Sequence, residues 1–312
     1  KAGTLPLSYT RGTSSVARVR PLAYFPAMDV HFRLLDVFCD RPFAGNQLCV
    51  VPEVPEGLDT AAMHTLAREI GFSETTFVTE AAGDRYTMRI FTPDQELPFA
   101  GHPTLGTAYL LVAEERVTSP VIQTTSVGEV PVEIDVEEGF GWMRQRPPVF
   151  GPEFPDRALV ARAAGLEPDD LAPDLPAQVV STGLGPLIAP VRDLETLRRA
   201  ERDARATREV CERAGGECLY LFAVTPEGVT ARMFDPGVGI GEDPATGSAA
   251  GPLGAYLATR GSAGMPGRVT VAQGEQVGRP SFLHLDVAHD GGALVVRVGG
   301  GVRVVGEGRF RL

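Results

Sequence analysis

The stretch RIFTPDQELPFAGHPTLGTA, residues 89–108, decides the fold because its opening returns later in the chain. Its first five residues, RIFTP (89–93), match RMFDP at residues 232–236. After each proline, a loop containing Gly and Pro opens a run of small and apolar residues, which predicts helices over 102–115 and 246–261. Helices of this composition are buried on most sides. One duplication at an offset of 143 residues indicates two similar domains rather than a solenoid of short repeats.

The helices and strands expected around the two matching segments, 89–93 and 232–236, follow the same order. Apolar spacing before Gly71 predicts a helix at 58–71, and the other patterns predict strands before and after it. In the first half the strands are expected at 30–39, 47–53, 74–80 and 84–93. The second half repeats this order of elements, with a helix expected at 207–215 and strands at 218–226 and 228–236. A ligand site is expected between two such domains.

Composition limits the classes of function. The chain has 312 residues, of which 43% are hydrophobic and 22% charged, as expected for a globular protein of two domains of about 150 residues. A net charge of −11 argues against nucleic acid, which needs a basic surface. No stretch approaches ~18 apolar residues, so we expect no membrane span.

Four cysteines occur, at Cys39, Cys49, Cys211 and Cys218. They form no C-x-x-C pair and lack histidines at the spacing of a metal site, so we expect no bound metal. Cys39 and Cys49 lie in apolar, strand-like runs, where reduced and buried thiols are usual. A reducing, cytoplasmic location fits this pattern.

Residues 1–27 differ from the rest, with four basic residues, no acidic residue and many Ser, Thr and Pro. They lack the continuous apolar segment of a secretory signal. We expect a leader or added segment outside the fold, with Met28 as the native start.

Two loops open the small-residue helices, at 100–104 (AGHPT) and 243–248 (DPATGS). Helix N-termini present unpaired N–H groups and a positive dipole end, which suit a carboxylate or phosphate. The alternative is that Thr and Ser only cap the helices. Neither loop has the glycine pattern of a nucleotide-binding motif, so a small carboxylate is the favoured ligand.

Three titratable residues lie on this repeated frame. Glu74 begins an otherwise apolar strand, where partial desolvation would raise its pKa and make it a general acid/base. His102 can exchange a proton near neutral pH, and Asp243 opens the second loop. Alone, each has a simpler interpretation: a solvent-facing Glu at a strand edge, a loop histidine and a turn-forming Asp.

The longest motifs resemble the PhzF family of phenazine biosynthesis, which has the diaminopimelate epimerase fold. They are GFSETTFV (71–78), IFTPDQELPFAGHPTLGTA (90–108) and GEDPATGSAAGP (241–252), with FAGN (43–46) and QGEQVGRPS (273–281) in addition. The resemblance implies an α+β fold of two domains, each a curved sheet or barrel around a central helix at 103–115 or 246–260. We expect an N-terminal domain of 28–147 plus 301–312 and a C-terminal domain of 148–300, assembled as a homodimer.

The resemblance also implies an isomerase without a cofactor, acting on trans-2,3-dihydro-3-hydroxyanthranilate. Glu74 matches the carboxylate that transfers a proton from C3 toward C1, with His102 and Asp243 as its helpers. Substrate-holding positions fall at Ser73, Gly101, Thr246, Gly247 and Ser248. Two alternatives remain: a racemase or epimerase acting on another small carboxylate, and a non-catalytic binding protein. Thiol-based epimerisation is disfavoured because the two helix-opening loops contain no cysteine.

Overall fold

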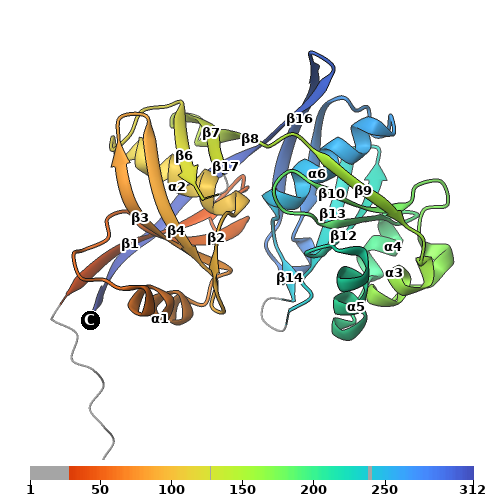
Figure 1. The fold of residues 1–312 in the computed structure, drawn as a ribbon, viewed down its shortest axis with the longest axis horizontal. Coiled ribbons are helices and arrows are strands. Elements are labelled where there is room, and N and C mark those ends of the chain that lie inside the picture. Colours follow the sequence, from red (N-terminus) through yellow and green to blue (C-terminus); the bar gives the residue numbers. More distant parts are fainter. Residues whose placement is uncertain (1–27, 127, 238–240) are drawn as a thin grey trace, which may run out of the picture.

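Two lobes lie side by side in the computed structural model, which describes residues 28–126, 128–237 and 241–312 (Figure 1). The expectation for residues 1–27 lies outside the described residues. The four helices predicted from sequence are confirmed with small shifts at their ends: α1 (Thr60–Ile70), α2 (Gly101–Ala113), α5 (Ala204–Ala214) and α6 (Gly247–Thr259). In the part of the chain described, no helix has the length and apolar character needed to cross a membrane.

The first lobe is a closed barrel around α2. Pairing runs from strand to strand and returns to the start through β1–β17. Its strands are β1 (Asp29–Val37), β2 (Asn46–Val51), β3 (Glu74–Ala82), β4 (Arg85–Phe91), β6 (Val121–Thr125), β7 (Gly128–Asp135), β8 (Phe140–Arg144) and β17 (Ala293–Arg311). Because α2 is surrounded, it is buried along nearly its whole length, as its small and apolar residues predicted.

The second lobe repeats this plan around α6. Its strands are β9 (Val149–Phe154), β10 (Ala177–Ser181), β11 (Leu187–Pro190), β12 (Leu219–Thr225), β13 (Gly228–Phe234), β15 (Gly267–Gln273), β16 (Ser281–Asp290) and again β17. No pairing between described residues joins β9 to β17, so this sheet is curved but open. The resulting α+β architecture is the predicted epimerase-like fold.

The long strand β17 joins the lobes. Its first part pairs with β16, residues 297–301 pair with β8, and residues 302–311 pair with β1. Figure 1 shows it crossing from the second lobe to the first, where the chain ends. We propose that the first domain comprises residues 28–147 and 301–312 and that the second comprises residues 148–300.

Strand register aligns the two halves residue by residue. Two short strands, β5 (Glu96–Leu97) and β14 (Glu242–Asp243), precede the central helices. Phe91 pairs with Glu96 in the first half, and Phe234 pairs with Glu242 in the second. Asp243 therefore corresponds to an apolar residue, Leu97, and His102 corresponds to Ser248. The two loops are equivalent, but their titratable residues are not.

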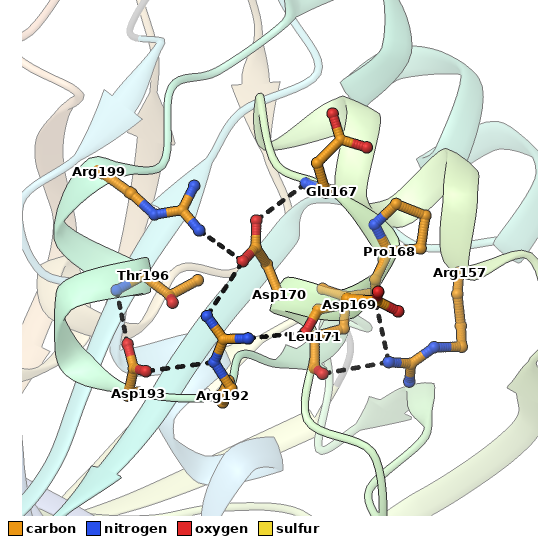
Figure 2. A network of polar contacts seen from close by, with 10 residues as sticks. All are labelled: Arg157, Glu167, Pro168, Asp169, Asp170, Leu171, Arg192, Asp193, Thr196 and Arg199. Atoms are coloured by element: carbon orange, nitrogen blue, oxygen red, sulfur yellow. Dashed lines mark hydrogen bonds and ion pairs between the residues drawn. The ribbon is translucent and has the colours of Figure 1, made fainter.

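The outer face of the second lobe is held by a polar network (Figure 2). It connects α3 (Arg157–Ala163), the 3-10 turn η1 (Pro168–Asp170) and α4 (Leu194–Arg199), none of which the sequence patterns predicted. Asp170 accepts from Arg199 at 2.5 Å and from Arg192 at 3.3 Å, and hydrogen bonding to Arg199 lowers the pKa of this carboxyl. Arg157 donates to the carbonyl of Pro168, which begins η1, and to those of Leu171 and Ala172, which follow it, so we interpret the network as structural.

Candidate active site

The N-termini of α2 and α6 meet between the lobes. A Cβ atom at Gly101 would lie 2.8 Å from the backbone nitrogen of Ser248, and one at Gly247 would lie 2.8 Å from the ring of Phe38. Real side chains do not tolerate such distances, so glycine is required at both positions. The close approach brings two helix dipoles and their free N–H groups to one place.

Glu74 is the first residue of β3 and points into this junction. Its side chain is 15% exposed, so it is not the solvent-facing carboxylate of the simpler interpretation. Its Oε2 atom is buried and has no hydrogen-bond partner among the described residues. Burial is the main reason that the pKa of Glu74 is raised to about 7, and the charge of Asp235 raises it further. A hydrogen bond from the Ser73 hydroxyl lowers this pKa by a smaller amount. The carboxyl can therefore gain or lose a proton near neutral pH.

His102 is the second residue of α2 rather than a loop residue, and it is 5% exposed. Its Nε2 atom lies 3.4 Å from Glu74 Oε2 and has no hydrogen-bond partner among the described residues. Burial lowers the pKa of His102 to about 4, although the charge of Asp243 opposes this shift. The ring is therefore neutral at pH 7 and can donate or accept a hydrogen bond without carrying charge.

Asp243 lies on β14 and is 6% exposed. Thr246 donates to its Oδ2 atom at 2.5 Å, and Gln273 donates to its backbone carbonyl at 2.8 Å. Burial raises the pKa of Asp243 to about 7, and the charge of Glu74 adds to this rise. Two buried carboxyl groups that repel each other's charge resist ionising together.

Asn46, which sequence reasoning did not select, ties these groups together. Its Nδ2 atom donates to Asp243 Oδ1 at 2.8 Å and to the carbonyl of Ala245 at 2.9 Å, and lies 3.3 Å from His102 Nδ1. Its Oδ1 atom accepts from the Ser73 hydroxyl at 3.2 Å. The signal available in the sequence was a polar amide between Gly45 and an apolar strand, in the FAGN motif.

The capping interpretation of the two loops is wrong. Neither α2 nor α6 has a side-chain hydrogen bond at its N-cap. The Thr104 hydroxyl lies within hydrogen-bond distance of the Ala100 carbonyl and of the Gln123 side chain, and Thr246 donates to Asp243. Ser248 is half-buried and its hydroxyl has no partner among the described residues, so it remains available to a ligand.

All four cysteines are free thiols, and Cys39 and Cys49 are buried as predicted. By the register of β12 and β13, Cys218 occupies the position in the second lobe that Glu74 occupies in the first. Burial raises the pKa of Cys218 well above its usual value, so it stays a protonated thiol at pH 7. Of these two equivalent positions, only the one in the first lobe therefore carries a carboxyl group.

The fold is of the epimerase-like class, and the relatives that the chain matches are named isomerases. The chain is 35% identical to a predicted epimerase of known structure from Pseudomonas aeruginosa, with a TM-score of 0.78 over 90% of this chain and 98% of that one. It is 32% identical over 82% of its length to an uncharacterized isomerase from Clostridium acetobutylicum, 89% of which is covered. It is 33% identical over 81% of its length to the trans-2,3-dihydro-3-hydroxyanthranilate isomerase of Pseudomonas chlororaphis, 88% of which is covered.

The family is shown by the sequence as a whole. Residues 35–308 match the PhzC-PhzF model, described as phenazine biosynthesis-like protein. The chain belongs to this family, as the motifs around the two helix-opening loops predicted.

Proposed function

We propose that the protein moves a proton from C3 to C1 of trans-2,3-dihydro-3-hydroxyanthranilate, with Glu74 as the general acid/base. The observation that carries the proposal is the unpartnered carboxyl of Glu74, whose pKa of about 7 is matched to proton transfer at neutral pH. The relative from Pseudomonas chlororaphis bears the name of this activity.

In the proposed mechanism, the carboxylate of Glu74 removes the proton at C3 and the electron pair of that C–H bond moves into the ring. A proton is then delivered at C1, so the reaction is an isomerisation with no net gain or loss of atoms. The enol that results relaxes to the ketone. A positioned base contributes typically ~10²–10⁴-fold to the rate.

The remaining groups would hold and polarise the substrate. The free hydroxyl of Ser248 and the N–H groups at the start of α6 are suited to bind the substrate carboxylate. His102 would pass a proton between the two carbons, a role supported by its neutral ring and its distance of 3.4 Å from Glu74. Asp243 fixes this arrangement through Asn46 and Thr246.

The test is to incubate the protein with the substrate in D₂O and follow deuteration at C1 by NMR. We expect deuterium at C1 with the natural protein, and loss of turnover by ~10²-fold or more in Glu74→Gln. Absence of deuteration, or full activity in Glu74→Gln, rejects the proposal. Racemisation of amino acids is measured in parallel, because activity there with none on the dihydroaromatic acid would identify an epimerase. Tight binding of the acid with neither activity would identify a binding protein.

A further inference from the structure

A cavity of about 370 Å³ lies between the lobes. Its walls are formed by the segment before α2, the β6–β7 hairpin, the crossover after β8 and the turn at 182–184 in the second lobe. Glu74, His102 and Asp243 do not line it. Cavities of this size that combine apolar walls with a few polar groups are typical of sites for small ligands.

The repeat relates this cavity to the candidate active site. The parallel pairs β2–β3 and β11–β12 are equivalent in the two lobes, and they align Leu187 with Cys49. Three residues earlier in each lobe, Leu184 therefore corresponds to Asn46. From β5 and β14, Pro98 corresponds to Pro244, which follows Asp243. Part of the cavity wall therefore corresponds to residues beside the active site. The equivalents of Glu74, His102 and Asp243 are Cys218, Ser248 and Leu97, and none of these residues lines the cavity.

Two arginines supply the charge at this cavity. Arg144 and Arg146 are exposed, alternate along an extended segment and so share one side of it. Neither forms an ion pair or side-chain hydrogen bond with any residue in the described part of the chain, in a protein of net charge −11. Glu129 also lines the cavity, but it is paired with Arg85 at 2.6 Å. The two guanidinium groups are thus free to receive an anion, and arginine binds carboxylates in a two-pronged geometry.

A buried amide lies among the cavity walls. Gln145 is 8% exposed, and its Oε1 atom accepts from Thr182 at 2.6 Å. Its Nε2 atom is buried and has no hydrogen-bond partner among the described residues. A buried donor left unpaired is costly, and a bound ligand or water commonly satisfies it.

We propose that this cavity binds a small organic carboxylate with an apolar body, as a site separate from the active site. Arg144 and Arg146 would bind the carboxylate, and the apolar walls at Phe99, Val130 and Leu184 would contact the body of the molecule. Because the walls come from both lobes, the ligand would bridge them. Phe99 lies three residues before His102, so the bound molecule would contact the segment that leads into the active site.

The test uses 4-bromobenzoate as the probe, soaked into crystals and titrated by calorimetry. We expect an anomalous bromine peak between Phe99 and Leu184, and binding that weakens by about tenfold or more in Arg144→Gln/Arg146→Gln. The control is Arg205→Gln/Arg311→Gln, which removes two exposed arginines that also lack partners among the described residues, and it should bind as the natural protein does.

A bromine peak only beside Glu74 and His102, or no peak at all, overturns the inference. Equal binding by the two double variants also overturns it, because the charge of the protein and not the cavity would then explain the affinity. Neither result bears on the proposed isomerisation, which rests on Glu74 and is tested by deuteration.

Discussion

The Oε2 atom of Glu74 lies 3.4 Å from the Nε2 atom of His102, yet the two groups do not form an ordinary ion pair. Burial raises the pKa of the carboxyl to about 7 and lowers that of the imidazole to about 4. The usual order of the two pKa values is reversed, so between pH 4 and pH 7 the carboxyl is protonated beside a neutral imidazole, and the carboxyl ionises near pH 7. The pair is then poised to give up or receive that proton when a substrate enters.

The pH dependence of the rate should report the ionisation of Glu74. A base must be ionised to act, so kcat/KM should rise with pH through about 7. Burial is the main cause of this pKa, and the charge of Asp235 adds to it. Asp235→Asn should therefore move the acid limb of the profile to lower pH. The control is Asp290→Asn at the tip of β16, and equal profiles for the two variants would contradict the assignment.

Stability should also depend on this carboxyl. Its pKa is raised from 4.5 in the unfolded chain to about 7, so the folded state loses stability as the pH rises through that window. Glu74→Gln removes the cost of burying the charge. We expect the variant to gain on the order of 2 kcal/mol relative to the natural protein between pH 5 and pH 8, measured by urea unfolding. Parallel pH dependences for the two proteins would contradict a buried, titrating Glu74.

The sequence was sufficient for the frame of this site because the frame is repeated. Phe91 and Phe234 each end a strand that leads to a helix of small residues, and that periodicity is local. The local pattern could not reveal that Asp243 corresponds to Leu97, because that alignment depends on the pairing of β14 with β13. Asn46 was missed for a related reason: its burial arises only when the second lobe covers it.

Asn46→Ala should impair catalysis more than it impairs folding. The amide positions Asp243 and the carbonyl of Ala245 across the junction of the lobes, and its hydrogen bond opposes part of the rise in the pKa of Asp243. We expect kcat to fall by about 10- to 100-fold, since misplacement of a supporting group commonly has this effect. Thr246→Val removes the other side-chain donor to the carboxyl group of Asp243 and should have a similar effect. A normal kcat in both variants would show that Asp243 needs no positioning.

The two lobes contain equivalent ion pairs that differ in burial, so the effect of burial on their contribution to stability can be measured. Arg89 pairs with Glu96 and Arg232 with Glu242, each at 2.7 Å, but the side chain of Arg89 is 28% exposed and that of Arg232 is 7% exposed. Arg232→Ala should destabilise the fold by about 3–5 kcal/mol because it leaves a buried charge unpaired. Arg89→Ala should cost about 0.2–1 kcal/mol. Denaturant unfolding of the two variants gives the comparison, and equal losses would contradict it.

The rate of the reaction should depend on how closely the N-termini of the two central helices approach each other. In Gly101→Ala the new Cβ atom would lie 2.8 Å from the backbone nitrogen of Ser248, so the N-termini of α2 and α6 must move apart. Displacements of about 1 Å can reduce rates by ~10²-fold. Overpacking of this kind typically costs ~1–3 kcal/mol.

Gly254→Ala, within α6, is the matched control for this substitution. The nearest atoms that its Cβ atom would meet are side-chain ends, namely those of Val287 at 3.1 Å, Leu285 at 3.2 Å and Met265 at 3.8 Å, so a shift of a few tenths of an ångström accommodates it. We therefore expect both variants to fold, as judged by thermal unfolding, but only Gly101→Ala to lose kcat. If Gly101→Ala retains the natural kcat, the spacing of the two helix N-termini does not control the reaction. If Gly254→Ala loses as much activity, the loss reflects general disturbance of the core and not the junction of the lobes.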